Sequence, residues 1–391
     1  MKILSIESSA DETSVSIIDA QGDFPQATYE VLGNALHSQV ELHTQYGGIF
    51  PAMAKREHAK AVVPLLKRAL EEAELFTEEK NELNQQQTEV LFELLTREPG
   101  LAETLSAFFE SCERPDIDLI AVTSGPGLEP ALWVGVNFAK ALAEIWNIPV
   151  VAVNHMEGHI LASIYDVDEE NQLAQIPFPT IALLISGGHT ELIHMKGWGQ
   201  YEKIGQTRDD AIGEAYDKVA RMLDLPYPGG PEVERLAKIA RIENLPAYAT
   251  LPRPMLHSKD LDFSFSGIKT AVRYAIAEKE LTEDEKKALA RDFEDAVTEV
   301  LIKKTRDAVD EYGAETVVVG GGVSASKHLR HELNAAFISS HPNVTLYYPK
   351  PGLSTDNSVM IALAGHARIA SASNAAAARY LKADGNRSLG E

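Results

Sequence analysis

The chain has 391 residues, of which 45% are hydrophobic and 24% are charged, as is typical of a globular protein with two or three domains. Its single cysteine, Cys112, excludes an internal disulfide framework and fits a reducing cytosol, so we expect a cytoplasmic protein. The net charge of -22 argues against a broad nucleic-acid-binding surface, although a local basic patch or a basic partner would still allow such binding.

The N-terminal residues predict a strand, a polar turn and a second strand. Residues 3–6 and 15–18 are mostly apolar, and residues 7–14 between them are mostly polar. Glu7 comes too early for a signal peptide, and no apolar run approaches the roughly 20 residues of a membrane helix. The same hairpin layout recurs at residues 180–193, which indicates a duplicated domain.

Strands and helices alternate over the rest of the chain, which predicts an α/β fold. Further strands are expected at 118–123, 316–319 and 344–348, and helices at 59–70, 133–145, 283–312 and 358–371. Residues 71–113 are rich in acids and Gln with helical stripes, and we interpret them as a peripheral helical insertion. We divide the chain into an N-terminal lobe (1–172), a C-terminal lobe (173–372) and a tail (373–391) that is Ala- and Asn-rich and expected to fray.

Two histidines, His155 and His159, follow an apolar run at residues 150–153. On a helix, positions i and i+4 lie on one face, so both imidazoles can reach one metal ion. The zinc-protease motif requires Glu directly after the first histidine, where this chain has Met156. Asp356 either caps the helix that follows it or completes a two-histidine metal site. Taken alone, a histidine pair at this spacing is as often a surface accident as a ligand pair.

The turns of the two hairpins carry different chemistry. The turn at residues 186–190, Ser-Gly-Gly-His-Thr, exposes N–H groups and hydroxyls that could hold a phosphate oxygen, unless it is only a tight hairpin. The first turn carries Asp11 and Glu12, which would repel a phosphate and suit a metal, a water or a substrate amine. Plain turn acids are the alternative.

A glycine-rich segment, residues 320–325, follows the strand at 316–319 and fits the dinucleotide fingerprint. That fingerprint expects an acid at the end of the next strand, and residues 347–350 (Tyr-Tyr-Pro-Lys) contain none. The segment therefore argues against a nicotinamide enzyme but remains compatible with an adenosine close to the backbone. A rigid turn at residues 227–232 opens another helix, which Asp217 precedes.

Nine segments, taken in order, resemble one family. They are IESSADETS (6–14), YGGIFP (46–51), GPGL (125–128), HMEGH (155–159), LISGGHT (184–190), YPGGP (227–231), DFSFSG (262–267), GGGVSA (320–325) and TDN (355–357). Together they are similar to the TsaD family of bacterial tRNA N6-adenosine threonylcarbamoyltransferases, which are related to the KEOPS catalytic subunit and were once labelled O-sialoglycoprotein endopeptidases. Only residues 71–113 and the tail lie outside the resemblance.

The resemblance implies a fold of the actin/hexokinase ATPase type, with two ribonuclease-H-like lobes around a nucleotide cleft. It implies transfer of a threonylcarbamoyl group from threonylcarbamoyl-AMP to N6 of adenosine 37 in tRNAs that read codons beginning with A, which forms t6A. The partners that it implies are tRNA, a paralogous subunit, an ATPase subunit and an enzyme that makes the adenylate, with no membrane involved.

The resemblance also implies which residues form the site. One divalent metal per subunit, Fe(II) ahead of Zn(II), would be held by His155, His159 and Asp356. Asp11 or Glu12 would accept the proton of the attacking amine. The adenylate would contact Leu184, Ile185, Ser186, Gly187, Gly188, Asp217, Gly230, Glu234 and Ser326.

Three residues depart from the family pattern. Ala10 and Ser354 stand where the family usually has Cys, and Ser326 stands where it usually has Asn. Ser326 keeps a hydroxyl but lacks the amide, so we expect one nucleotide contact to weaken. Three other functions stay open: a metal-dependent glycoprotease, a small-molecule kinase of the same fold class, and a non-catalytic scaffold that binds a nucleotide and a dimer partner.

Overall fold

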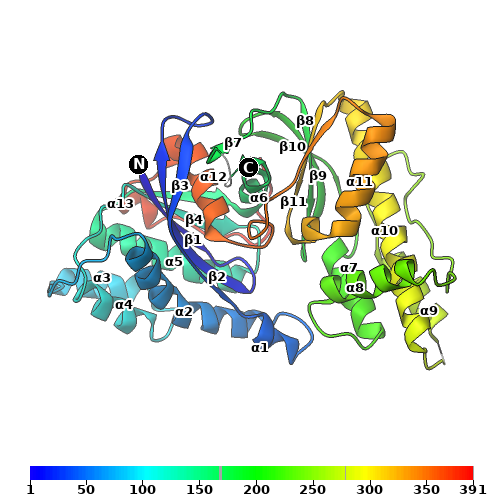
Figure 1. Cartoon of the computed structure of the whole chain (residues 1–391). Coiled ribbons are helices and arrows are strands. Elements are labelled where there is room, and N and C mark those ends of the chain that lie inside the picture. Colours follow the sequence, from blue (N-terminus) through cyan, green and yellow to red (C-terminus); the bar gives the residue numbers. More distant parts are fainter. Residues whose placement is uncertain (167–169, 278, 391) are drawn as a thin grey trace.

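The computed structural model describes residues 1–166, 170–277 and 279–390, and contains two mixed sheets (Figure 1). The first sheet has the strand order β5-β4-β1-β2-β3-β7-β6. Strands β1, β2 and β3 are antiparallel, and β4 and β5 run parallel to β1. Its strands are β1 (Lys2–Glu7), β2 (Glu12–Gln21), β3 (Thr28–Ser38), β4 (Leu119–Gly125), β5 (Val150–Asn154), β6 (Tyr165–Asp166) and β7 (Gln172–Leu173).

The second sheet repeats this arrangement in the order β10-β9-β8-β11-β12. Again three antiparallel strands are followed by two parallel ones. Its strands are β8 (Thr180–Ile185), β9 (Thr190–Gly197), β10 (Gln200–Gln206), β11 (Thr316–Gly320) and β12 (Thr345–Tyr347). Two lobes that share this ribonuclease-H-like order form the actin/hexokinase type of architecture, so the predicted fold and its duplication are confirmed.

Helices form three layers around the two sheets (Figure 1). Because strand residues alternate in direction, Leu4 faces an outer layer of helices while Ile3 faces a central layer shared by both sheets. The outer layer of the first lobe holds α1 (Val40–Thr44), α2 (Pro51–Glu72) and α5 (Glu129–Trp146). The central layer holds α6 (His155–Ile164) and α12 (Ser358–Ala367). The outer layer of the second lobe holds α7 (Ile212–Met222), α8 (Gly229–Ile242), α9 (Ser266–Ala275), α10 (Glu283–Tyr312) and α11 (Lys327–Ser340).

The longest of these helices, α10, has the bounds that its sequence predicts. Thr282 accepts a hydrogen bond from the Glu285 N–H, and the Glu285 side chain bonds back to the Thr282 N–H, which closes a capping box. Gly313 ends the helix in the left-handed region at φ 64°. The predicted helix at 358–371 is shorter than expected, because α12 ends at Ala367 and a short 3-10 turn, Ile369–Ser371, follows.

The insertion at residues 71–113 is helical, as predicted, and lies outside α2 and α5. It contributes α3 (Gln85–Leu94) and α4 (Leu101–Phe109), whose apolar residues join the outer core of the first lobe. The buried Glu98 anchors it: Asn137 Nδ2 donates to Glu98 Oε2 at 3.2 Å, and Lys55 Nζ lies 3.6 Å from Glu98 Oε1. Burial raises the pKa of Glu98.

The expectation that the tail frays is wrong over its described residues. After the short helix α13 (Ala375–Ala378), the Asp384 N–H donates to Ser124 O at 2.8 Å, and the Gly127 N–H donates to Gly385 O at 3.1 Å. Ala378 and Leu389 are buried. The small residues of the tail suggested an unstructured segment, but the tail packs against the loop that follows β4. In the same loop, the Leu128 N–H donates to Ser9 O.

Among the described residues, the structure has no helix whose length and apolar character would let it cross a bilayer.

Candidate functional site

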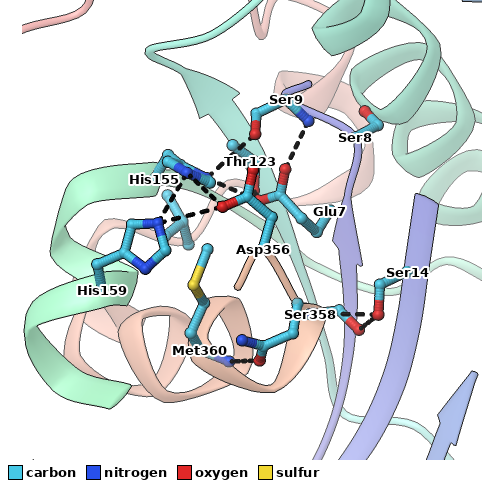
Figure 2. Close-up of polar contacts among 12 residues, drawn as sticks. Glu7, Ser8, Ser9, Ser14, Thr123, His155, His159, Asp356, Ser358 and Met360 are labelled. Atoms are coloured by element: carbon cyan, nitrogen blue, oxygen red, sulfur yellow. Dashed lines mark hydrogen bonds and ion pairs between the residues drawn. The ribbon is translucent and has the colours of Figure 1, made fainter. Parts of the chain in front are cut away.

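Three predicted ligands meet where α6 and the loop before α12 come together (Figure 2). His155 Nε2 lies 3.1 Å from His159 Nε2, and Asp356 Oδ1 lies 3.3 Å and 3.2 Å from these two nitrogens. The histidine side chains are buried, and that of Asp356 is 18% exposed. The sequence prediction that these three residues form one group is confirmed.

The dimensions of this triangle fit one metal ion. Nitrogen and oxygen ligands bind zinc at about 2.0–2.2 Å, so two ligands of one ion are about 3.0 Å apart in an octahedron and about 3.4 Å in a tetrahedron. The observed edges of 3.1–3.3 Å lie between these values. Three ligands on one side of an ion leave further positions open for a substrate or water. Two imidazoles and a carboxylate suit iron and zinc alike.

The helix α6 presents both histidines because of its first turn. Asn154 caps the helix by accepting a hydrogen bond from the Met156 N–H at 2.9 Å. Gly158, between the ligands, faces α12: a Cβ there would lie 3.0 Å from Met360 Cγ. A glycine at this position therefore lets α6 approach the helix that follows Asp356.

A second carboxylate, Glu7, orients the first histidine from behind (Figure 2). Glu7 Oε2 lies 3.1 Å from His155 Nδ1, and Glu7 also accepts hydrogen bonds from the Ser9 N–H and the Thr123 hydroxyl. The Ser9 hydroxyl lies 3.2 Å from the same imidazole nitrogen. A carboxylate on the outer nitrogen of a ligand histidine keeps the inner nitrogen free for a metal.

Burial and neighbouring charges shift the pKa values of His155, His159 and Asp356 in different directions. Burial disfavours a charge on His155, but Asp356 and Glu7 outweigh it and raise the pKa of His155 well above its usual value. Burial lowers the pKa of His159. Burial also opposes the charge of Asp356, yet the two histidines lower its pKa. The charged form of His155 is therefore favoured in the metal-free protein, and a metal ion would compete with its added proton.

Of the two predicted catalytic acids, Asp11 lies in the turn between β1 and β2, and Glu12 is the first residue of β2. The charge of Asp356 acts on the pKa of both. Burial raises the pKa of Asp11. Burial, together with the charges of Asp356 and Asp11, raises the pKa of Glu12 to about 10. At neutral pH Glu12 therefore carries a proton in the metal-free protein.

The predicted phosphate turn joins β8 to β9. The Ser186 N–H donates to His189 O at 2.9 Å, and the His189 N–H donates to Ser186 Oγ at 3.1 Å. Gly187 and Gly188 are exposed, and a Cβ on either would meet no atom within 4 Å, so a ligand could reach their backbone. The Leu184 and Ile185 side chains are fully buried, so only their backbone could meet a ligand.

The remaining predicted residues lie at the starts of α8 and α11 or bond to them. Asp217 Oδ1 accepts a hydrogen bond from the Gly229 N–H at 2.7 Å, beside Gly230. Glu234 Oε1 accepts from the Lys327 and His328 N–H groups at 2.7 and 3.1 Å, next to Ser326. Ser326 caps α11 by accepting from the Leu329 N–H at 3.2 Å.

The phosphate turn packs closely on Gly213 at the beginning of α7, the helix that also carries Asp217. A Cβ on Gly213 would lie 2.7 Å from Ser186 O and 2.8 Å from Gly187 Cα, so only glycine allows this approach. Burial raises the pKa of Asp217, and the charge of Asp11 in the first lobe raises it further. The structure thus gathers most of the predicted residues around one region between the lobes.

Sequence reasoning assigned no role to three further residues of this region. Glu7 is a buried acid at the end of a strand, a pattern that could have marked it. Burial and the charges of both ligand histidines lower the pKa of His189 to about 4. Tyr227 O accepts a hydrogen bond from Thr44 Oγ1 at 3.2 Å, which joins the lobes. Burial, together with the charges of Asp11 and Asp217, raises the pKa of Tyr227.

Comparison with known proteins identifies one family. The family model described as TsaD, tRNA N6-adenosine threonylcarbamoyltransferase, matches residues 30–81 and 101–363. Residues 82–100, between the two matches, lie within the insertion.

Individual relatives support the same family assignment as the family model. The tRNA N6-adenosine threonylcarbamoyltransferase of Paraburkholderia xenovorans is 42% identical over 372 residues, which cover 94% of this chain and 92% of the relative. The protein of that name from Ralstonia pickettii is 41% identical over 374 residues, with the same coverage. A crystal structure of HypF from T. kodakarensis is more distant, with 13% identity and a TM-score of 0.49 over 70% of this chain and 44% of that one.

The sequence matches therefore carry the assignment, and the chain belongs to the TsaD family of tRNA N6-adenosine threonylcarbamoyltransferases.

Proposed function

We propose that the protein transfers the threonylcarbamoyl group of threonylcarbamoyl-AMP to N6 of adenosine 37 in tRNAs that read codons beginning with A, forming t6A. Membership of the family supports the reaction. The observation that carries it in the structure is the buried triangle of His155, His159 and Asp356, together with a glycine turn open to a ligand.

The residues of the chain divide the work of the reaction. The open backbone at Gly187 and Gly188 would hold the adenylate, so that proximity lowers the barrier. The N6 amine attacks the carbonyl carbon, the bond from that carbon to the phosphate oxygen breaks, and AMP leaves with the electron pair. Asp11 or Glu12 accepts the proton from the amine.

The metal proposed for this site is one divalent ion per subunit, Fe(II) ahead of Zn(II). When bound it would act as a Lewis acid on a substrate oxygen. His155, His159 and Asp356 would hold it, and Glu7 would keep His155 oriented.

The partners proposed from the family are tRNA, a paralogous subunit and an ATPase subunit. The net charge of -22 favours a division of labour in which a partner supplies part of the basic surface for tRNA.

The test is a transfer assay with purified metal-loaded protein, its partners, threonylcarbamoyl-AMP and unmodified tRNA, followed by digestion to nucleosides and mass spectrometry. We expect t6A with the wild type and none with His155→Ala. His257→Ala, an exposed histidine of the second lobe, is the matched control and should keep the activity. Equal activity of His155→Ala and the wild type would refute the proposed metal site, and no t6A with every partner present would refute the function.

A further inference from the structure

The second lobe contains a cavity of about 560 Å³ between α8, α10 and α11. Its lining includes none of the residues of the metal triangle or of the phosphate turn. Sites for small molecules usually enclose about 300–1,000 Å³ and combine apolar walls with a few polar groups. The size of this cavity is therefore that of a ligand site, and its lining charges indicate what kind of ligand it would take.

Most charges around the cavity are already paired. Arg241 bonds to Glu294 at 2.6 Å and also pairs with Asp295, which lies 3.4 Å from His328 Nε2. The Glu299 carboxylate pairs with Arg253 at 2.7 Å, and Lys303 pairs with Asp307 at 2.5 Å. These pairs neutralise one another and leave little attraction for a charged ligand.

Arg306 is the exception. Its Nε is buried and has no hydrogen-bond partner in the part of the chain that the structure describes, and no ion pair of Arg306 occurs there. An unsatisfied buried donor is costly, and an arginine carries five donors in a planar fork that matches carboxylate and phosphate groups. In a chain with 58 acids against 36 bases, an arginine left without an acid partner is unexpected.

The other walls of the cavity are partly apolar. Leu256 and Ile302 line it together with Arg306. Both are only half-buried, so an occupant with an apolar body would cover surface that is now open to water. A bare inorganic ion would fill little of this volume.

We propose that this cavity binds a small organic anion, a carboxylate or a phosphate monoester, whose charged group pairs with Arg306 and whose apolar part lies on Leu256 and Ile302. This site is separate from the proposed adenylate site, and its occupant need not take part in the transfer reaction.

The experiment is isothermal titration calorimetry of the metal-loaded full chain with benzoate and phenyl phosphate as probes. We expect saturable binding of at least one probe by the wild type, and a loss of about tenfold or more in affinity for Arg306→Gln. Arg68→Gln, which removes the same charge from an exposed ion pair on α2, is the matched control and should bind as the wild type does.

A second variant keeps the test decisive if Arg306→Gln does not fold. Ile302→Trp fills the cavity and leaves the guanidinium in place, and it should also lose probe binding. The proposal is overturned if the wild type binds neither probe saturably. It is equally overturned if the correctly folded variants bind the probes as tightly as the wild type.

Discussion

At the scale of single residues, the metal centre depends on a carboxylate that does not face the metal position. Glu7 lies at the end of β1, fully buried, and bonds to the outer nitrogen of His155. Thr123 and the Ser9 N–H fix its two oxygens in turn. The orientation of a ligand histidine is therefore set by the hydrogen bonds of a strand end.

Replacing Glu7 with Gln should lower metal affinity roughly 10- to 100-fold, because the imidazole loses its charged acceptor. Competition with a chelator, followed by metal analysis of the protein, measures this change. Glu72→Gln, which alters a carboxylate on α2 far from the centre in sequence, should leave the affinity unchanged. An unaltered affinity in Glu7→Gln would show that His155 is oriented by other contacts.

Replacing Glu12 with Gln should change how stability depends on pH. Because the pKa of Glu12 is raised from 4.5 to about 10 on folding, the stability linked to this group is present at low pH and is lost as pH rises between those values. Gln does not titrate, so the metal-free variant should gain on the wild type as pH rises. Urea unfolding of both metal-free proteins at about pH 5 and about pH 9 measures the difference.

The exposed Glu103→Gln is the control for this prediction, since its unfolding should follow the wild type at both pH values. A difference between Glu12→Gln and the wild type that stays constant with pH would mean that Glu12 is ionised in the folded protein.

At the scale of elements, the turn between β8 and β9 both closes the hairpin and leaves backbone accessible to a ligand. Its hydrogen bonds between Ser186 and His189 close the turn, while Gly187 and Gly188 leave backbone open to a ligand. The start of α7 packs directly against this turn at Gly213. The turn is therefore supported by α7 on one side, and its glycine backbone remains accessible on the other.

A methyl group at position 188 should weaken ligand binding at the turn without affecting its folding. In Gly188→Ala the new Cβ meets no protein atom within 4 Å, so the free energy of unfolding should change by less than about 0.5 kcal/mol. The same methyl group would stand where the proposed adenylate approaches, so AMP affinity should fall about tenfold or more. Calorimetric titration with AMP and urea unfolding measure the two quantities.

Gly197→Ala, at the other end of β9, adds a methyl group with only ordinary contacts and should leave AMP affinity as it is. Unchanged AMP binding by Gly188→Ala would place the adenylate elsewhere.

At the scale of the whole molecule, both elements that carry the metal ligands lie in the central layer, between the two sheets. Ile160 of α6 and Met360 of α12 belong to the core that contacts strands of both lobes. The buried Glu157 adds a polar tie, since Arg368 at the end of α12 lies 2.8 Å from it and Tyr201 of β10 donates to it at 2.8 Å. A change at the metal centre therefore acts on the layer that joins the lobes.

Metal removal should lower the stability of the whole chain. A ligand that binds only the folded state stabilises it by about 2.7 kcal/mol at 100 times its dissociation constant. Scanning calorimetry with and without a chelator should show a lower melting temperature in the metal-free protein. His159→Ala should melt at the same temperature in both conditions, and an equal shift in that variant would mean that the chelator acts elsewhere.

Local patterns in the sequence determined much of this protein. The repeated hairpin predicted the duplicated lobes, and the amphipathic pattern of residues 283–312 predicted the bounds of α10, because both patterns depend on residues that are near neighbours in the chain. The spacing of His155 and His159 predicted their shared face for the same reason. The family motifs added Asp356, which no local pattern could have joined to them.

Only the tertiary structure decided which distant residues meet. Glu7 reaches His155 across 148 positions of the chain, and the tail packs on the loop after β4 although its own composition predicted disorder. Arg306, whose Nε has no hydrogen-bond partner among the described residues, likewise becomes visible only when α8, α10 and α11 surround a cavity beside it. Burial, pairing of charges and ligand geometry are properties of contacts between separate elements, and such contacts exist only after the chain has folded.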